Sequence, residues 1–198
     1  MSLLVESLKL KDGFICNLEY HQNRLNRSMD ELFPGKKHID LSKEIIIPEN
    51  FKKGPFKIRV LYTHTVENIE MESYLFRNIQ SLKIVHHESI DYHLKYSDRQ
   101  ILQELFALRG DCDDIIIIKN GLVTDSFAAN LLFFDGEKWI TPETPLLKGT
   151  KRQFLLDHGI ISEMGIREKD IRNFQKVGLV NAMIDFDEMP VIPVNQIF

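Results

Sequence analysis

The segment GLVTDSFAANLLFF, residues 121–134, decides the fold of the second half of the chain. Its first residue completes an Asn120–Gly121 pair, which is typical of a tight turn between two paired strands. The apolar run Ile115 to Ile118 precedes this turn, and a second run, Leu131 to Phe134, closes the segment. The pattern predicts a strand-rich second half in which one acidic residue, Asp125, stands between two strands.

The remainder of the second half continues with alternating strand and helix signals. A turn is expected at Asp135 and Gly136. The elements expected after it are a strand, two helix-like stretches and a final strand: Lys138 to Thr141, Lys151 to Asp157, Glu168 to Phe174 and Val177 to Ile184. Pro190 and Pro193 are expected to prevent regular strand pairing beyond them, because proline has no backbone N–H to donate.

The first half has the pattern of a small antiparallel sheet that carries a helix. Leu4 to Leu10 reads as a strand, and Leu18 to Leu32 places apolar residues on one face of a helix that ends at Pro34 and Gly35. Three alternating runs follow, the first over Phe56 to Tyr62 and the others beginning at Ile69 and Leu82.

A polar, non-periodic stretch from His86 to Tyr96 separates the two halves, and a helix over Ile101 to Leu108 follows it and ends at Gly110. We therefore expect an α+β fold with a small α/β domain over residues 1–86 and a larger strand-rich domain over residues 95–198. Residues 87–94 are expected to form the interdomain connection.

Composition excludes several classes of protein. The 198 residues carry 25 basic and 29 acidic side chains, a net charge of -4, and no basic block, so nothing favours binding to nucleic acid. Cys16 and Cys112 stand far apart, which argues against a disulfide scaffold and fits a reducing cytoplasm. No window resembles a signal peptide or a membrane span. A cytoplasmic protein with a small-molecule partner is expected.

No metal site is expected. His86 and His87 are adjacent, so in a strand they point to opposite faces and cannot easily share an ion. Asp111, Asp113 and Asp114 form an acidic cluster that lacks the glycine and the terminal glutamate of a calcium loop.

Six segments together resemble the class IV aminotransferases, the fold type IV pyridoxal phosphate enzymes. They are VESLKLKDG, LEYHQNRLNRS, YHLKYSDR, GLVTDSFAANLLFF, TPETPLLKGTKR and LVNAMIDFDEMPVIPV, and they span nearly the whole chain in the family's order. That family includes branched-chain and D-amino acid aminotransferases and 4-amino-4-deoxychorismate lyase. The resemblance implies a two-domain, D-amino acid aminotransferase-like fold, with a small α/β domain and a strand-rich pseudo-barrel domain that binds pyridoxal 5'-phosphate.

The resemblance makes Lys95 the Schiff-base lysine and the carrier of protons during catalysis. An amine attacks a carbonyl only when neutral, so its pKa of about 10.4 must be lowered by burial or by a positive neighbour. Asp125 falls where the family normally has glutamate, and Asn130 follows it at the family's spacing. A carboxylate there keeps the pyridine nitrogen protonated.

The phosphate of the cofactor is expected at the helix that Gly149 opens, where the first amide groups of Thr150 and Lys151 have no partner within the helix. The resemblance adds Arg24 from the small domain, and it adds the backbone near Asn181 and Ala182 as a second phosphate-binding turn. An ordinary helix start and a solvated helix face are the alternatives for Gly149 and Arg24.

Two departures from the family bear on the reaction. Longer relatives have about thirty residues more before the VES segment, so the resemblance implies a short member without one strand pair. Gln100 stands five residues after Lys95, where branched-chain aminotransferases have tyrosine, and Arg99 is closer to the lyase-like pattern.

The expected function is that of a pyridoxal phosphate-dependent lyase or transaminase that acts on an amino acid-like small molecule, with a slight preference for the lyase. A homodimer is expected from the resemblance and from a first half that looks too thin to close a core by itself. The alternative is a non-catalytic relative that binds the cofactor or a metabolite.

Overall fold

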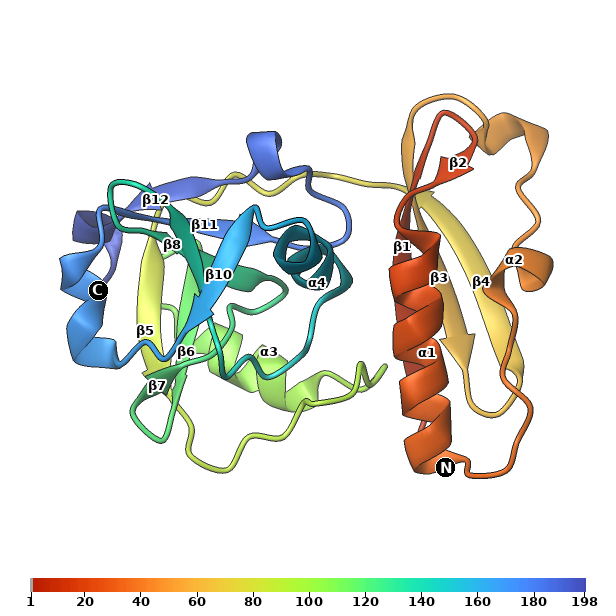
Figure 1. The fold of residues 1–198 in the computed structure, drawn as a ribbon, viewed down its shortest axis with the longest axis horizontal. Helices are drawn as coiled ribbons and strands as arrows, with labels where there is room; N and C mark the ends of the chain where they lie inside the picture. Colours follow the sequence, from red (N-terminus) through yellow and green to blue (C-terminus); the bar gives the residue numbers. More distant parts are fainter. Residues whose placement is uncertain (1) are drawn as a thin grey trace. The chain divides into compact units, whose positions relative to one another are not determined.

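The computed structural model describes residues 2–198 and divides them into two units, which are described separately (Figure 1). The first unit runs to Phe76 and also contains Leu94–Asp98, whereas the second contains Arg77–His93 and Arg99–Phe198. The division differs from the one expected at residues 87–94, because the strand before that stretch packs in the second unit and Lys95 packs in the first.

The first unit is built on an antiparallel sheet in the order β2-β1-β3-β4. Its strands are β1 (Leu4–Lys11), β2 (Phe14–Ile15), β3 (Pro55–Tyr62) and β4 (Val66–Ser73). The first strand pairs with the third along its full length, from Leu4 opposite Tyr62 to Lys11 opposite Pro55. The strands predicted at the start of the chain and from the first two alternating runs are therefore confirmed.

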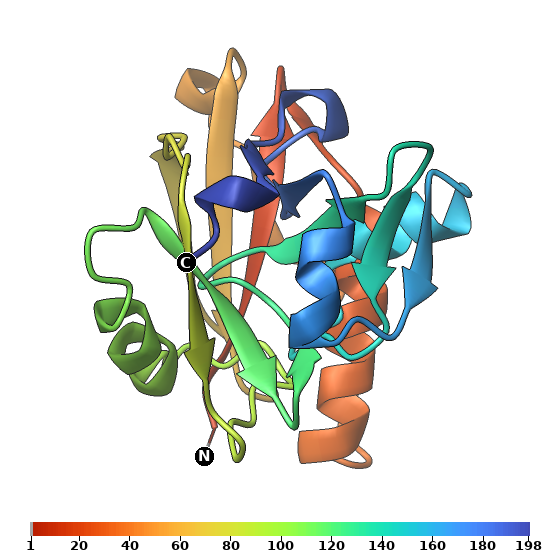
Figure 2. The same cartoon turned by 90° about the vertical axis from the view of Figure 1, so that its left-hand side faces the viewer.

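The predicted helix is confirmed as α1 (Leu18–Leu32), which runs along one face of this sheet (Figures 1 and 2). Its residues Leu25 and Met29 are fully buried in one cluster with Leu8 and Ile58 of the sheet. Two short helices, α2 (Leu41–Glu44) and η1 (Glu49–Phe51), follow. The first unit thus buries a core of its own, and the expectation that it is too thin to do so is wrong.

The segment that contains Lys95 is tied to the free end of β1. The amide of Val5 donates to the carbonyl of Lys95 at 2.9 Å, and the amide of Ser97 donates to the carbonyl of Leu3 at 2.9 Å. Between them Leu4 and Tyr96 form an antiparallel bridge. Backbone hydrogen bonds therefore fix the position of the lysine's main chain within the first unit.

The second unit contains a five-stranded sheet in the order β10-β9-β8-β11-β12 and a three-stranded sheet in the order β5-β6-β7. The strands are β5 (Leu82–His86), β6 (Asp114–Lys119), β7 (Leu122–Val123), β8 (Asn130–Phe134), β9 (Trp139–Pro142), β10 (Ile161–Met164), β11 (Lys176–Val180) and β12 (Val191–Pro193). Both sheets contribute to one core, for example through Ile116, Phe133 and Val177. The strand-rich second half is thereby confirmed.

Helices complete the second unit: α3 (Gln100–Ala107), α4 (Thr150–Asp157), η2 (Glu168–Asn173), η3 (Phe186–Glu188) and η4 (Val194–Gln196). The predicted hairpin turn is confirmed, because Asn120 and Gly121 both have positive φ, at 53° and 73°. None of the helices described in residues 2–198 has the length and apolar character needed to cross a membrane.

Two sequence-based expectations about strand pairing are wrong. The third alternating run, β5, does not join the small sheet but lies parallel to β6. Parallel strands need a long crossover, and the chain between these two includes α3. The proline-rich end also forms a strand, β12, in which Pro193 lies opposite Lys176 of β11. Because β12 is at the edge of the sheet, no further strand needs the N–H that proline lacks.

Candidate active site

In the first unit, a buried carboxylate binds and orients Arg24, the arginine predicted to contact the phosphate of the cofactor. Glu6 of β1 is fully buried, and Arg24 of α1 donates to both of its oxygens, from Nε to Oε1 at 2.8 Å and from Nη2 to Oε2 at 2.6 Å. The Nδ1 atom of His21, one helical turn earlier, lies 2.6 Å from Oε2 of the same carboxylate. Arg24 is therefore no solvated helix residue.

The charges of this cluster are set by its burial and its contacts. Burial alone would raise the pKa of Glu6, but the charge and hydrogen bonds of Arg24, assisted by His21, lower it to about 2. Burial lowers the pKa of His21, the carboxylate of Glu6 partly opposes this, and the positive charges of Arg24 and Lys95 lower it further. His21 is thus neutral at pH 7 and donates from Nδ1 to the ionised Glu6.

In the second unit, Asp125 is buried and held at both oxygens. Asn130 Nδ2 donates to its Oδ1 at 2.7 Å, and the amide of Leu147 donates to its Oδ2 at 2.9 Å. Burial raises the pKa of Asp125 to about 6, and these hydrogen bonds and the charge of Arg152 only partly oppose the rise. Asp125 is therefore a basic carboxylate inside the protein and not a solvated turn residue.

Gly149 is required by the position of Asn130. A Cβ atom at residue 149 would lie 2.0 Å from Oδ1 of Asn130, whose Nδ2 also donates to the carbonyl of Leu147 at 2.9 Å. The φ of Gly149 is -67°, so close approach and not backbone conformation demands the glycine. Asn130 thereby connects the acid at Asp125 to the start of α4.

The start of α4 has the features of an anion site. Within the part of the chain that the structure describes, Gly149 is the N-cap and no side chain caps this helix. Thr150 and Lys151 are buried, and Lys151 Nζ lies 3.5 Å from Asp185 Oδ1. Amide groups at a helix N-terminus attract a phosphate.

The next residue of α4, Arg152, has a structural role. Its Nε donates to Thr141 Oγ1 at 3.1 Å, its Nη2 donates to the carbonyl of Pro142 at 2.8 Å, and the same nitrogen is paired with Glu163.

The predicted second phosphate-binding turn, Asn181 and Ala182, begins where β11 ends. Asn181 Oδ1 accepts from the amide of Met183 at 2.9 Å, and its Nδ2 donates to the carbonyl of Ala128 at 3.2 Å. The turn is thus linked to the loop that follows Asp125.

The predicted residues therefore form two groups, one in each unit. Lys95 and Arg24 belong to the first unit, whereas Asp125 and the residues at the starts of α4 and of the 181–182 turn belong to the second. Sequence reasoning missed Glu6 and His21. A signal existed for Glu6: it shares the sheet face of Leu4 and Leu8, where an isolated charge must have a partner.

Comparison with known proteins identifies the class. Residues 3–197 match the profile of the amino-transferase class IV family, so the chain belongs to that family. A Haemophilus influenzae protein of uncharacterized function is 41% identical over 183 residues, which cover 91% of this chain and 97% of that one.

Two solved structures share the fold. A candidate 4-amino-4-deoxychorismate lyase from Haemophilus somnus is 34% identical with a TM-score of 0.87, covering 92% of this chain and 97% of that one. A hypothetical aminotransferase from Mycobacterium tuberculosis in its pyridoxal phosphate-bound form is 18% identical with a TM-score of 0.77, covering 96% and 80%. The predicted fold type IV architecture is confirmed, and the first structure matches this chain over nearly its whole length.

Proposed function

We propose that this chain is a pyridoxal 5'-phosphate-dependent enzyme, a 4-amino-4-deoxychorismate lyase-like protein or an amino acid aminotransferase, with Lys95 as the point of covalent attachment. The observation that carries the proposal is Asp125, a buried carboxylate whose pKa is raised to about 6. A carboxylate of that basicity suits a protonated heteroaromatic nitrogen, and a helix start without a side-chain cap suits a phosphate. The residues present thus fit the cofactor.

Each residue group would have a distinct task. Asp125 would hold a proton at the ring nitrogen, and Gly149, Thr150 and Lys151 would bind the phosphate together with Arg24, Asn181 and Ala182. The ring of the bound cofactor would withdraw electrons from the substrate carbon. Lys95 Nζ would take the proton from that carbon and return it.

Of the two proposed reactions, we prefer the lyase reaction to amino group transfer. Gln100 replaces the tyrosine expected five residues after the lysine in branched-chain aminotransferases, and Arg99 fits the lyase-like pattern. A likeness to one candidate 4-amino-4-deoxychorismate lyase, at 34% identity, favours the same reaction. Release of pyruvate from 4-amino-4-deoxychorismate, measured beside amino group transfer to 2-oxoglutarate, separates the two activities.

Borohydride reduction of the cofactor-loaded protein, followed by peptide mapping, tests the role of Lys95. We expect the label on Lys95 alone, and we expect Lys95→Ala to remain folded but lose the label and the turnover. Lys148→Ala, which changes an exposed lysine beside α4, is the matched control and keeps both. A label on another lysine, or normal turnover by Lys95→Ala, contradicts the proposal. Binding without turnover by the parent supports the non-catalytic relative.

A further inference from the structure

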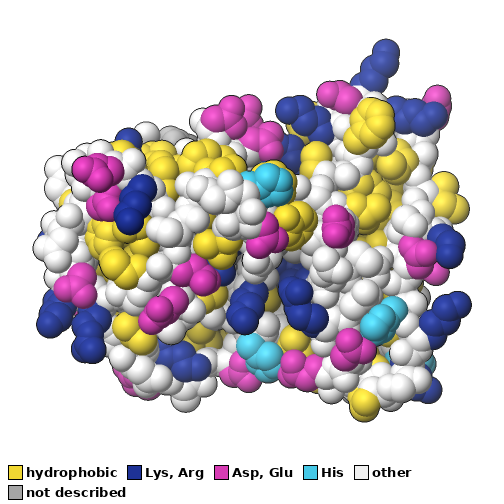
Figure 3. Space-filling model, viewed as in Figure 1, with side chains coloured by type: hydrophobic (Ala, Val, Ile, Leu, Met, Phe, Trp, Pro, Cys, Tyr) yellow, Lys and Arg dark blue, Asp and Glu magenta, His cyan; other side chains and the backbone are white. Residues whose placement is uncertain are grey.

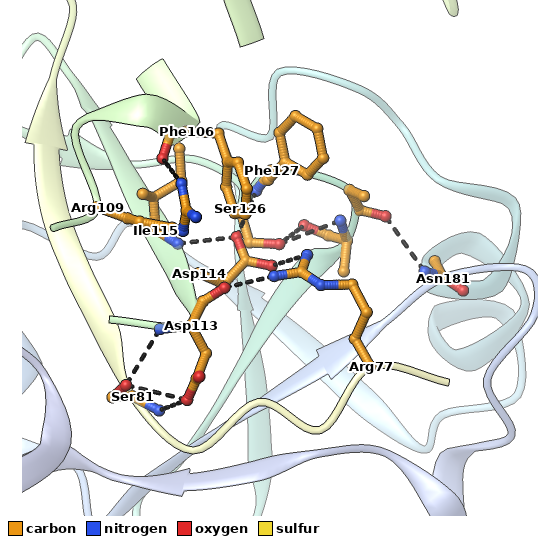
Figure 4. A network of polar contacts seen from close by, with 12 residues as sticks. Arg77, Ser81, Phe106, Arg109, Asp113, Asp114, Ile115, Ser126, Phe127 and Asn181 are labelled. Atoms are coloured by element: carbon orange, nitrogen blue, oxygen red, sulfur yellow. Dashed lines mark hydrogen bonds and ion pairs between the residues drawn. The ribbon is translucent and has the colours of Figure 1, made fainter. Parts of the chain in front are cut away.

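A second buried carboxylate of the second unit is not used by the proposed reaction. Asp114 opens β6 and is 1% exposed. Its Oδ2 accepts from Arg77 Nη1 at 2.9 Å, and its Oδ1 accepts from the amides of Ile115 at 2.8 Å and Phe127 at 3.1 Å (Figure 4). Burial raises the pKa of Asp114 although Arg77 and these amides oppose the rise. Because burying a carboxylate costs free energy, we expect Asp114 to have a structural or functional role.

The contact with Phe127 indicates this role, because Phe127 lies in the four-residue loop Ser126–Ala129 that joins Asp125 to Asn130. The loop is a tight turn in which the amide of Ser126 donates to the carbonyl of Ala129 at 2.9 Å. Its two flanking residues form an antiparallel bridge and a side-chain hydrogen bond. A displacement of the loop must therefore move Asp125, Asn130, or both.

Other groups fix the same loop. Arg99 Nη2 donates to the carbonyl of Phe127 at 2.7 Å, and its guanidinium lies 4.2 Å from the centre of the Phe127 ring. That ring stacks on Phe106 with centres 4.4 Å apart. The carbonyl of the next residue, Ala128, accepts from Asn181, which belongs to the proposed phosphate-binding turn (Figure 4).

We infer that Asp114 is a positioning residue for the cofactor: by accepting the amide of Phe127, it holds the 126–129 loop in the place that aligns Asp125 with the turn at Asn181. The inference deepens the proposed function and rests on it. Asp114 contacts the loop at the amide of Phe127, so its effect on Asp125 and on the turn at Asn181 is exerted through the loop backbone. Removing it leaves a part-buried N–H without an acceptor, which the loop relieves by moving.

Titration of the purified protein with pyridoxal phosphate tests this inference. We expect Asp114→Ala to weaken cofactor binding by about tenfold or more, the equivalent of one lost hydrogen bond to a charged group. Asp114→Asn keeps an oxygen for the Phe127 amide and should restore most of the affinity. The pH midpoint of the visible absorbance of the bound cofactor should shift in Asp114→Ala, because Asp125 is displaced, and a merely structural role would not move it.

Asp113→Ala is the matched control. Asp113 Oδ2 also accepts two backbone amides, from Gln80 at 2.8 Å and Ser81 at 3.0 Å, but neither belongs to the loop. We expect this variant to lose stability. Its cofactor affinity should stay within twofold of that of the parent, and its absorbance midpoint should equal that of the parent within experimental error. If Asp114→Ala does not fold, Asp114→Ser replaces it, since serine is too short to reach the loop.

The possible outcomes are distinct. A parent that binds no pyridoxal phosphate overturns the proposed function and this inference with it. A parent that binds the cofactor, with an Asp114 variant that binds it equally well and with an unchanged midpoint, overturns the inference alone. An equal loss of affinity in the Asp113 and Asp114 variants also overturns it, since the effect would then be general destabilisation.

Discussion

The side-chain oxygen of Asn130 occupies the space that a Cβ atom at Gly149 would need, at a distance of 2.0 Å. The amide group of the same asparagine binds Asp125 and the carbonyl of Leu147. One side chain therefore couples the acid that would face the cofactor ring to the helix start that would bind its phosphate. We therefore expect a change at Asp125 or at Gly149 to affect the other position through Asn130.

Gly149→Ala should be destabilising, because the new methyl group forces Asn130 off its two partners. We expect a loss of about 1–3 kcal/mol in the free energy of unfolding, measured by urea denaturation, and weaker binding of pyridoxal phosphate. Lys148→Ala, at the exposed neighbouring position, should change neither quantity. An alanine variant as stable as the parent would show that Asn130 has room to move.

Asp125 should make the cofactor-free protein less stable as the pH rises. Its pKa is about 6 in the folded protein and 3.8 in the unfolded chain, so the folded state binds the proton more tightly. Its contribution therefore falls between pH 4 and pH 6, by about 3 kcal/mol at most. Asp125→Asn should lack this slope when unfolding is followed from pH 4 to pH 7. Parallel profiles for parent and variant would refute the raised pKa.

Glu6→Gln should destabilise the protein strongly, because it leaves the buried charge of Arg24 without its counter-ion. A loss of about 3–5 kcal/mol is expected from denaturant unfolding at pH 7. The pKa of Glu6 is lowered to about 2 from 4.5, so its stabilisation is complete above pH 4.5 and is lost toward pH 2. The variant should therefore be less sensitive to acid in that window.

A surface pair provides the control for Glu6. Glu72, 53% exposed, forms an ion pair with Lys57 in the same sheet, and Glu72→Gln should cost less than about 1 kcal/mol. Similar losses for the two variants would mean that burial adds nothing to the Glu6 pair.

We also predict a homodimer whose dissociation reduces activity, in keeping with the family resemblance. Leu75 and Phe76 are 85% and 51% exposed, an apolar pair that a second chain could cover. Sedimentation at micromolar concentration should give twice the 23.2 kDa chain mass, and Leu75→Ser should weaken the association. A monomer that binds pyridoxal phosphate and turns over at full rate would contradict this prediction.

Local patterns predicted most of the helices and strands, because the spacing of apolar residues alone indicates a helix such as α1 or a strand such as β1. The partners of the strands were less predictable. The alternation of β5 is the same whether it joins the first sheet or lies parallel to β6, and only packing against the rest of the second unit decides between them.

The candidate site divides in the same way. The family-like motifs pointed to Lys95 and Asp125, but no local pattern shows that the amide of Leu147 binds Asp125. Likewise, Glu6 and Arg24 are 18 positions apart in the sequence, and they form an ion pair only because α1 packs against the sheet that contains β1. Contacts between distant segments set the pKa of each acid, so the chemistry could not be read without the fold.

The pairing of Lys95 with β1 has a consequence for the order in which the chain folds during synthesis. The first unit is interrupted in sequence by Arg77–His93, so it is complete only after Leu94–Asp98 has left the ribosome. Until then the outer edge of β1 near Leu4 stays open to any strand that meets it, including one from another nascent chain. Pairing of the 95–97 segment with β1 therefore places Lys95 and closes that edge in the same folding step.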